Sequence, residues 1–134
     1  MNRDKQLLSL RPTINTEEAT GIELIQNAIL RPILKYQHDL LILVLEASPL
    51  AVRQLSAVDN ERDYHLKVKS LLSKDANLKG ILIGCITGLM TVEEYAAYAK
   101  NQKELNKRIL TMLAKRYTDT WVNAREGTRH LPLL

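Results

Sequence analysis

Apolar residues recur at steps of three and four along one long segment of the chain, and this spacing most constrains the fold. Such steps return a side chain to one face of an α-helix, whereas a strand requires alternation. The spacing continues without a shift through Pro32. This continuity favours one helix spanning residues 17–47 with a kink near Arg31 and Pro32; the alternative is two helices, the second of which begins at Pro32. The series comprises Ile22, Ile25, Ile29, Ile33, Tyr36, Leu40 and Leu43.

Capping residues predict where the helices begin. Asn15 or Thr16 precedes the first, and Ser48 followed by proline predicts a short helix over residues 49–57. Asp59 is expected to cap the next helix, and Asp75 a further one ending near residue 87. Thr91 and Glu94 have the spacing of a capping box, which opens the longest helix, ending near residue 124.

No segment shows the alternation and turn residues of a hairpin, and only residues 81–86 could form a short buried strand. We therefore expect an all-α fold: a five- to six-helix bundle with a long kinked N-terminal helix and a long C-terminal helix. The 134 residues form one domain, 1–134, with an N-terminal arm over 1–14 and a frayed tail over 127–134. Residues 40–45 are apolar on all sides, so we expect that segment to be the most buried.

Small residues recur every four positions at Ala76, Gly80, Gly84 and Gly88. An interior glycine costs about 1 kcal/mol of helix propensity relative to alanine. We favour a close approach of the first long helix to this face. The alternatives are a groove that admits a ligand against bare backbone, or a strand.

The length of the last helix predicts self-association. A helix of about 33 residues is about 50 Å long, whereas a compact domain of this size is roughly 36 Å across. The end that projects would expose Tyr117, Trp121 and Val122. Exposed apolar surface of this kind usually marks an interface, so we expect a homodimer that packs through these residues.

Basic residues concentrate in the last helix. Residues 100–116 hold six cations and one carboxylate, a net charge of +5, whereas the whole chain has +4. A solvated helix face is the ordinary interpretation, and a surface for nucleic acid or another polyanion is the alternative. The residues of that polyanion face are Lys100, Lys103, Lys107, Arg108 and Lys115.

A polar cluster at the expected kink offers a candidate ligand site. It contains Arg31, Gln37 and Asp39, and Tyr95 or Tyr98 could complete it. Lys35 and Asp39 have the spacing of a surface ion pair. A small-molecule binder or an enzyme built on this cluster would require a pocket near Pro32.

Catalytic and metal-binding constellations are not recognisable, so we expect no cofactor, no metal and no catalytic residue. His38 is interpreted as a core histidine with one hydrogen bond and His65 as a surface residue; a metal held by His38, Asp39 and His65 is a remote alternative. Cys85 lies in an apolar stretch, where cysteines are inert. Phosphate-loop spacing is absent as well.

Two segments resemble a small family of uncharacterised, all-helical bacterial proteins. One segment spans residues 30–41 (LRPILKYQHDLL), and the other combines residues 89–95 (LMTVEEY) with 104–109 (ELNKRI). The resemblance covers residues 25–118 and implies a helical fold without transferring any catalytic residue. Members are sometimes labelled "glyoxalase", but this sequence does not support the label, because it lacks the strands and the metal ligands of such enzymes.

We expect a non-enzymatic helical protein that works by association, first with itself and then with an unidentified protein partner. The alternatives are polyanion binding by the last helix and ligand binding at the kink. The N-terminus lacks the apolar run of a signal peptide, and no stretch approaches the 20 or so apolar residues of a membrane span. A cytoplasmic location is therefore expected.

Overall fold

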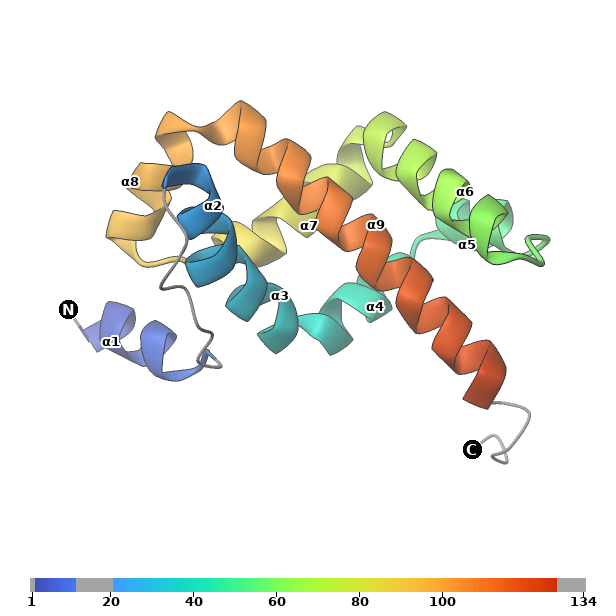
Figure 1. Cartoon of the computed structure of the whole chain (residues 1–134), viewed down its shortest axis with the longest axis horizontal. Coiled ribbons are helices and arrows are strands. Elements are labelled where there is room, and N and C mark those ends of the chain that lie inside the picture. The colour runs from blue at the N-terminus through green and yellow to red at the C-terminus, as the bar shows by residue number, and fades with distance from the viewer. Residues whose placement is uncertain (1, 12–20, 128–134) are drawn as a thin grey trace.

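A computed structural model describes residues 2–11 and 21–127 of the chain, and all the regular elements in this part are helical. The all-α class is therefore confirmed, with more and shorter helices than the five or six predicted (Figure 1). The elements are α1 (Asn2–Ser9), α2 (Gly21–Ile25), the π-helix η1 (Gln26–Leu30), α3 (Arg31–Tyr36), α4 (His38–Glu46), α5 (Pro49–Leu55), α6 (Glu61–Lys74), α7 (Ala76–Thr87), α8 (Val92–Lys100) and α9 (Gln102–Gly127).

Helix α9 forms the spine of the molecule. It contacts α6 along much of its length and also packs on α7, α8 and η1. Figure 1 shows it crossing the molecule from α8 to the C-terminal end. Its buried row follows a four-residue step through Leu105, Ile109, Leu113 and Tyr117, none of which is more than 1% exposed. This row is the centre of the hydrophobic core.

Tyr117 and Trp121, in the C-terminal half of α9, pack against the chain itself. The rings of Trp121 and Tyr64 of α6 stack with centroids 4.6 Å apart. The guanidinium of Arg125 lies 4.4 Å from the Trp121 ring and donates a hydrogen bond to the carbonyl oxygen of Asp59. The predicted projection therefore does not include Tyr117 and Trp121, because α6 packs against this part of α9; residues 123–126 are exposed, and Figure 1 shows the last turns of α9 extending away from α6.

The predicted long C-terminal helix is two helices, because the chain leaves the helical conformation at Asn101. This residue has φ −127° and ψ 29°. Its side-chain amide donates to the carbonyl oxygen of Ala97 at 3.1 Å, while its own carbonyl accepts from the N–H of Leu105 at 2.9 Å. Asn101 thus ends α8 and begins α9, a role that suits a short amide side chain. Because α8 is a separate helix, α9 has 26 residues, which corresponds to a length of about 39 Å at the usual helical rise.

The predicted single kinked N-terminal helix is not confirmed. From Gly21 to Glu46 the chain is divided into α2, η1, α3 and α4. Pro32 lies in the first turn of α3, as the two-helix alternative required. The preceding π-turn, in which the N–H of Arg31 bonds to the oxygen of Gln26, widens the helix just before the proline. The predicted start near Asn15 or Thr16 lies outside the described residues.

The segment over residues 40–45 is not the most buried part of the fold. Leu41 and Leu45 are buried, but Leu40 is 44% exposed and Leu43 is 61% exposed. Gln37 separates α3 from α4 with φ −89° and ψ 6°, and its side-chain amide donates to the carbonyl oxygen of Cys85 at 2.9 Å. This bond ties the start of α4 to α7, and the side of α4 with Leu40 and Leu43 has no neighbour within the described part of the chain.

Most of the predicted helix caps are confirmed. The side chain of Ser48 caps α5, that of Asp75 caps α7, and Thr91 with Glu94 forms the complete capping box of α8. The cap of α6 is Asn60 and not Asp59, because the Asn60 side-chain oxygen accepts from the N–H of Asp63 at 2.9 Å. Residues 81–86 belong to α7, so the strand alternative is wrong.

The glycines of α7 do not mediate close helix packing, contrary to expectation. Gly80 and Gly84 are exposed, and a Cβ added at either would meet nothing within 4 Å. Only at Gly88 is the space restricted, because an added Cβ would lie 2.9 Å from the carbonyl oxygen of Gly84. The core is instead filled from α7 by Leu78, Leu82 and Ile86.

The N-terminal arm is partly helical and is tied to the α7–α8 connection. The guanidinium of Arg11 donates to both carboxylate oxygens of Glu94, at 2.5 and 2.6 Å, and to the carbonyl oxygen of Leu89. Arg3 of α1 donates to the carbonyl oxygens of Gly88 and Met90. The predicted frayed tail beyond Gly127 lies outside the described residues. In the part of the chain that the structure describes, no helix is long and apolar enough to cross a membrane.

Replacing a residue of the buried α9 row should destabilise the fold strongly. For Leu113→Ala we expect a loss of about 2–5 kcal/mol in the free energy of unfolding, because the change removes buried methyl groups and leaves a cavity. Leu66→Ala is the matched control, since Leu66 is 53% exposed. Urea denaturation followed by circular dichroism measures both. Equal losses in the two variants would contradict the assignment of α9 as the spine.

The Arg11–Glu94 pair should make stability depend on pH. Burial raises the pKa of Glu94, but the hydrogen bonds from Arg11 and Thr91 outweigh this effect and hold that pKa below its ordinary value. A carboxyl whose pKa is lower in the folded state stabilises the fold above its unfolded pKa, about 4.3. This stabilisation is lost as the pH falls through the folded value. Glu94→Gln should cost about 1–3 kcal/mol at neutral pH.

Thermal melts between about pH 7 and pH 3 test this prediction against Glu93→Gln, its exposed neighbour on the same helical turn. The loss of stability on acidification should be smaller in the Glu94 variant than in the wild type. If Glu93→Gln reduced the dependence of stability on pH as much as Glu94→Gln does, the specific role of the Arg11–Glu94 pair would be disproved.

Candidate functional site

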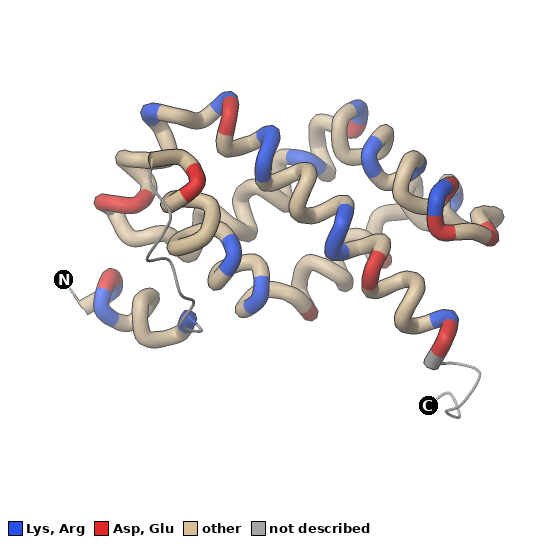
Figure 2. Tube along the Cα trace, viewed as in Figure 1, with Lys and Arg blue, Asp and Glu red and all other residues tan. Residues whose placement is uncertain are grey.

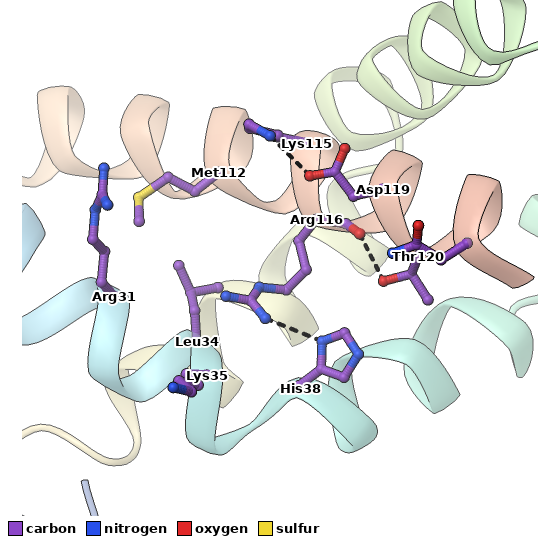
Figure 3. A pocket seen from close by; sticks show the side chains of 10 residues that line it. Arg31, Leu34, Lys35, His38, Met112, Lys115, Arg116, Asp119 and Thr120 are labelled. Atoms are coloured by element: carbon purple, nitrogen blue, oxygen red, sulfur yellow. Dashed lines mark hydrogen bonds and ion pairs between the residues drawn. The ribbon is translucent and has the colours of Figure 1, made fainter. Parts of the chain in front are cut away.

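A cleft of about 450 Å³ lies between α9 and the α3–α4 segment (Figure 3). Helices α3 and α4 form one wall and the middle turns of α9 form the other. The residues from α9 recur at steps of three and four and therefore follow one face of that helix, adjacent to the buried row. The lining residues are Arg31, Leu34, Lys35, His38, Met112, Lys115, Arg116, Asp119, Thr120 and Asn123.

The cleft is strongly basic. Its lining has four cationic side chains and one carboxylate, that of Asp119, which gives a net charge of +3 without His38. Lys115 forms an ion pair with Asp119 at 2.8 Å. Arg31, Lys35 and Arg116 have no carboxylate within ion-pair distance among the described residues. Figure 2 shows cationic residues on both α3 and the middle of α9.

Arg116 is held across the cleft by His38. A guanidinium nitrogen of Arg116 lies 3.1 Å from Nδ1 of His38, and Figure 3 shows the two side chains pointing toward one another. Because arginine can only donate, Nδ1 accepts this bond and the hydrogen of the neutral imidazole is on Nε2. The bond links α9 to α4 and fixes one nitrogen of the guanidinium.

Arg116 is partly withdrawn from water, and no carboxylate of the described residues forms an ion pair with it. Burial lowers the pKa of its guanidinium, and the more distant carboxylate of Asp119 raises it. The group nevertheless stays charged, because arginine does not lose its proton in proteins. A desolvated cation costs free energy unless it is paired. An anion bound in the cleft would supply the missing partner.

The remaining lining gives the cleft an apolar wall. Leu34 of α3 and Met112 of α9 face one another near Arg31 (Figure 3). The hydroxyl of Thr120 is already used, since it donates to the carbonyl oxygen of Arg116 at 2.8 Å. A smaller hollow of about 340 Å³, lined by Lys35, Tyr36, His38, Asp39 and Arg116, adjoins the cleft. The site thus combines cations with an apolar surface, the usual make-up of a ligand pocket.

The residues predicted at the kink are not brought together. Arg31 lines the cleft and Asp39 lines the adjoining hollow, but Gln37 is bonded to α7. Tyr95 and Tyr98 lie on α8, where their rings contact one another and the Tyr98 hydroxyl donates to Asn106. The predicted Lys35–Asp39 ion pair is not formed.

The predicted polyanion face is divided by the break at Asn101. Lys100 belongs to α8, whereas the other four residues belong to α9. Arg108 pairs with Glu104 and donates to Gln26, and Lys115 pairs with Asp119. Lys103 and Lys107 are exposed on α9. Lys115 is the only one of the five that also lines the cleft.

Tyr117 and Trp121, which were predicted to contact a second copy, contact other residues of the same chain. Tyr117 is 1% exposed, and its hydroxyl donates to the carbonyl oxygen of Leu41 at 2.5 Å. Trp121 is stacked on Tyr64 and Val122 is half-buried. The buried Tyr117 side chain is therefore not available to a second copy, and the predicted contact through it is wrong.

His38 and His65 each bond to a side chain of α9. His38 is half-buried and bonded to Arg116, and His65 is half-buried with Nδ1 3.1 Å from the Thr118 hydroxyl, so His65 is not the free surface residue predicted. Within residues 2–11 and 21–127, no group of three or more histidine, cysteine or acidic side chains could hold a metal.

Sequence reasoning missed the pairing of His38 and Arg116. Both residues belong to recognisable helices, and Met112, Arg116 and Thr120 share one face by their four-residue step. That periodicity marks a polar face of α9, but it contains no information about which helix lies opposite. Comparison of the chain with protein-family models, curated proteins and solved structures finds no match. The function is therefore argued from the cleft itself.

Cys85 should react slowly with thiol reagents. Burial raises the pKa of its thiol, which lowers the fraction of the reactive thiolate at neutral pH. We expect a rate constant with Ellman's reagent at pH 7.5 at least about tenfold below that of free cysteine. In urea-unfolded protein, the rate constant of Cys85 with Ellman's reagent should approach that of free cysteine. A native rate equal to that of free cysteine would contradict this prediction.

Proposed function

We propose that the protein binds a small organic oxyanion, with a phosphate or carboxylate group, in the cleft between α3, α4 and α9. The observation that supports this most is Arg116, which is partly desolvated, oriented by His38 and without a carboxylate partner among the described residues. A planar guanidinium presents parallel donors to an oxyanion, and charge-assisted bonds of this kind are roughly twice as strong as neutral ones.

The other lining residues define what such a ligand would look like. Arg31 and Lys35 add two cations on the opposite wall, which favours a group with more than one negative charge. Leu34 and Met112 would contact the carbon part of the ligand. A volume of about 450 Å³ is within the range of small-molecule pockets. The cleft therefore fits a compact phosphate monoester better than a bare inorganic ion.

Binding, rather than turnover, is the role that these groups support. Nδ1 of His38 is occupied by Arg116, and Lys115 is engaged with Asp119. Neither group is poised to transfer a proton, since a general base needs a free lone pair within reach of its substrate. The proposal therefore keeps the expectation of a protein that works by association, with a small anion as its first partner.

The test measures binding of four probes by isothermal titration calorimetry at about 50 mM salt, where exposed charges are only partly screened. The probes are phenyl phosphate, benzoate, inorganic phosphate and neutral benzyl alcohol. We expect phenyl phosphate to bind most tightly and benzyl alcohol not to bind. Arg116→Gln should weaken phenyl phosphate binding about 10- to 100-fold, the effect of losing charge-assisted hydrogen bonds of about 1.5–3 kcal/mol.

Lys69→Gln is the matched control, because Lys69 is an exposed cation of α6 outside the cleft lining. It removes the same net charge and should leave the affinity unchanged. Equal affinities for wild type and the Arg116 variant would overturn the proposal. Tight binding of an oligonucleotide that is lost in Lys103→Gln/Lys107→Gln but retained in Arg116→Gln would favour the polyanion alternative instead.

A further inference from the structure

The cations that a ligand of the cleft would meet fall into two groups. Lys35 and Arg116 line both the cleft and the adjoining hollow, whereas Arg31 lines the cleft alone. The apolar side chains of Leu34 and Met112 lie between the two guanidinium groups in Figure 3. The cleft therefore has a pair of cations on one side of an apolar contact and a single cation on the other side.

The spacing of residues along the two helices produces this separation. Met112 and Arg116 are four residues apart on α9, which corresponds to about 6 Å along the helix axis. Arg31 and Lys35 have the same four-residue spacing on α3. On each wall of the cleft, about one helical turn therefore separates the position of the single cation from that of the pair.

A second hydrogen bond between the helices limits the cleft beyond Arg31. Arg108 of α9 donates to the side-chain oxygen of Gln26 in η1 at 2.8 Å and pairs with Glu104 at 3.2 Å. Arg108 lies one turn before Met112, and neither Arg108 nor Gln26 lines the cleft. Because Arg108 already has these two partners, Arg31 is the last cation of the cleft in this direction.

The charges of the lining predict how many anionic groups a ligand would have. Lys115 is paired with Asp119, and the other three lining cations form no ion pair with any described residue. A phosphate monoester carries a charge of about −1.5 to −2 at neutral pH, which matches the pair formed by Lys35 and Arg116. Arg31 would still lack an anion, and it lies across an apolar surface that suits carbon atoms.

We infer that the ligand of the cleft has two oxyanionic groups joined by a compact apolar spacer. Lys35 and Arg116 hold a phosphate group, Arg31 holds a carboxylate, and the spacer lies on Leu34 and Met112. This inference rests on the proposed anion binding and adds the chemical class of the ligand to it. A guanidinium suits both ends, because it presents parallel donors to the oxygens of a phosphate or a carboxylate.

Four probes that share one benzene ring test the inference. They are phenyl phosphate and its para-carboxy, para-carbamoyl and ortho-carboxy derivatives. Isothermal titration calorimetry at about 150 mM salt limits charge effects that act over more than about 8 Å. We expect the para-carboxy probe to bind about three- to tenfold more tightly than phenyl phosphate, because it adds one charge-assisted contact at the protein surface. The neutral amide, and the ortho carboxylate beside the phosphate, should give no such gain.

Variants of Arg31 identify the residue that holds the second group. In Arg31→Gln the dissociation constants of phenyl phosphate and the para-carboxy probe should become equal, whereas Arg31→Lys, which keeps the charge, should retain part of the difference. The ratio of these two constants is compared, because a general change in the charge of the cleft affects both probes through their shared phosphate. Lys69→Gln removes an exposed cation outside the cleft lining and should leave the ratio unchanged. Circular dichroism checks that each variant is folded.

The results separate this inference from the proposal on which it rests. If neither phenyl phosphate nor the para-carboxy probe binds, both are overturned. If phenyl phosphate binds but the para carboxylate gives no gain, only the inference of a second anionic group is overturned. It is also overturned by a gain that persists in Arg31→Gln, or by an equal gain from the amide or the ortho carboxylate.

Discussion

The packing of α9 against the rest of the chain is the interaction on which this structure depends. Its buried row is almost completely sealed from solvent and contacts elements from both halves of the sequence. Tyr117 adds a hydrogen bond from the core to the backbone of α4, and Trp121 extends the contact to α6. The adjacent face of the same helix, with Met112, Arg116 and Thr120, forms one wall of the cleft. Stability and the candidate site are therefore built on neighbouring faces of one element.

Much of the helical architecture could be predicted because its signals are local. The capping box of α8 and the caps of α5 and α7 were predicted at the right residues, since a cap is decided within one turn. The prediction of a single N-terminal helix was not confirmed, because a regular spacing of apolar residues identifies one face only where the helix itself is regular. The π-turn before Arg31 and the irregular residue Gln37 change the rotation along the chain. Ile33 of the predicted stripe is buried, whereas Tyr36, Leu40 and Leu43 are exposed.

The candidate site was less predictable because it depends on pairing between distant helices. Arg31 was predicted from the kink, but Gln37, which was predicted beside it, bonds to α7, and Tyr95 and Tyr98 lie on α8. Arg116 was counted only as part of a basic run. Its significance comes from His38, 78 residues away in sequence, which orients it, and from the lack of an ion pair with any carboxylate in the described part of the chain. Periodicity identifies the faces of a helix, but the neighbour of each face is a property of the tertiary fold.

Gln37 determines how the two parts of the α3–α4 wall of the cleft meet. Its side chain bonds to α7 and its backbone departs from regular helix geometry, so α4 does not continue α3. Lys35, two residues before this point, and His38, one residue after it, both line the cleft. His38 contacts Arg116, whereas Leu40 and Leu43 of the same helix are exposed. A regular helix through residue 37 would change which face of α4 meets α9, so the interruption of the helix at Gln37 is a condition for the His38–Arg116 contact.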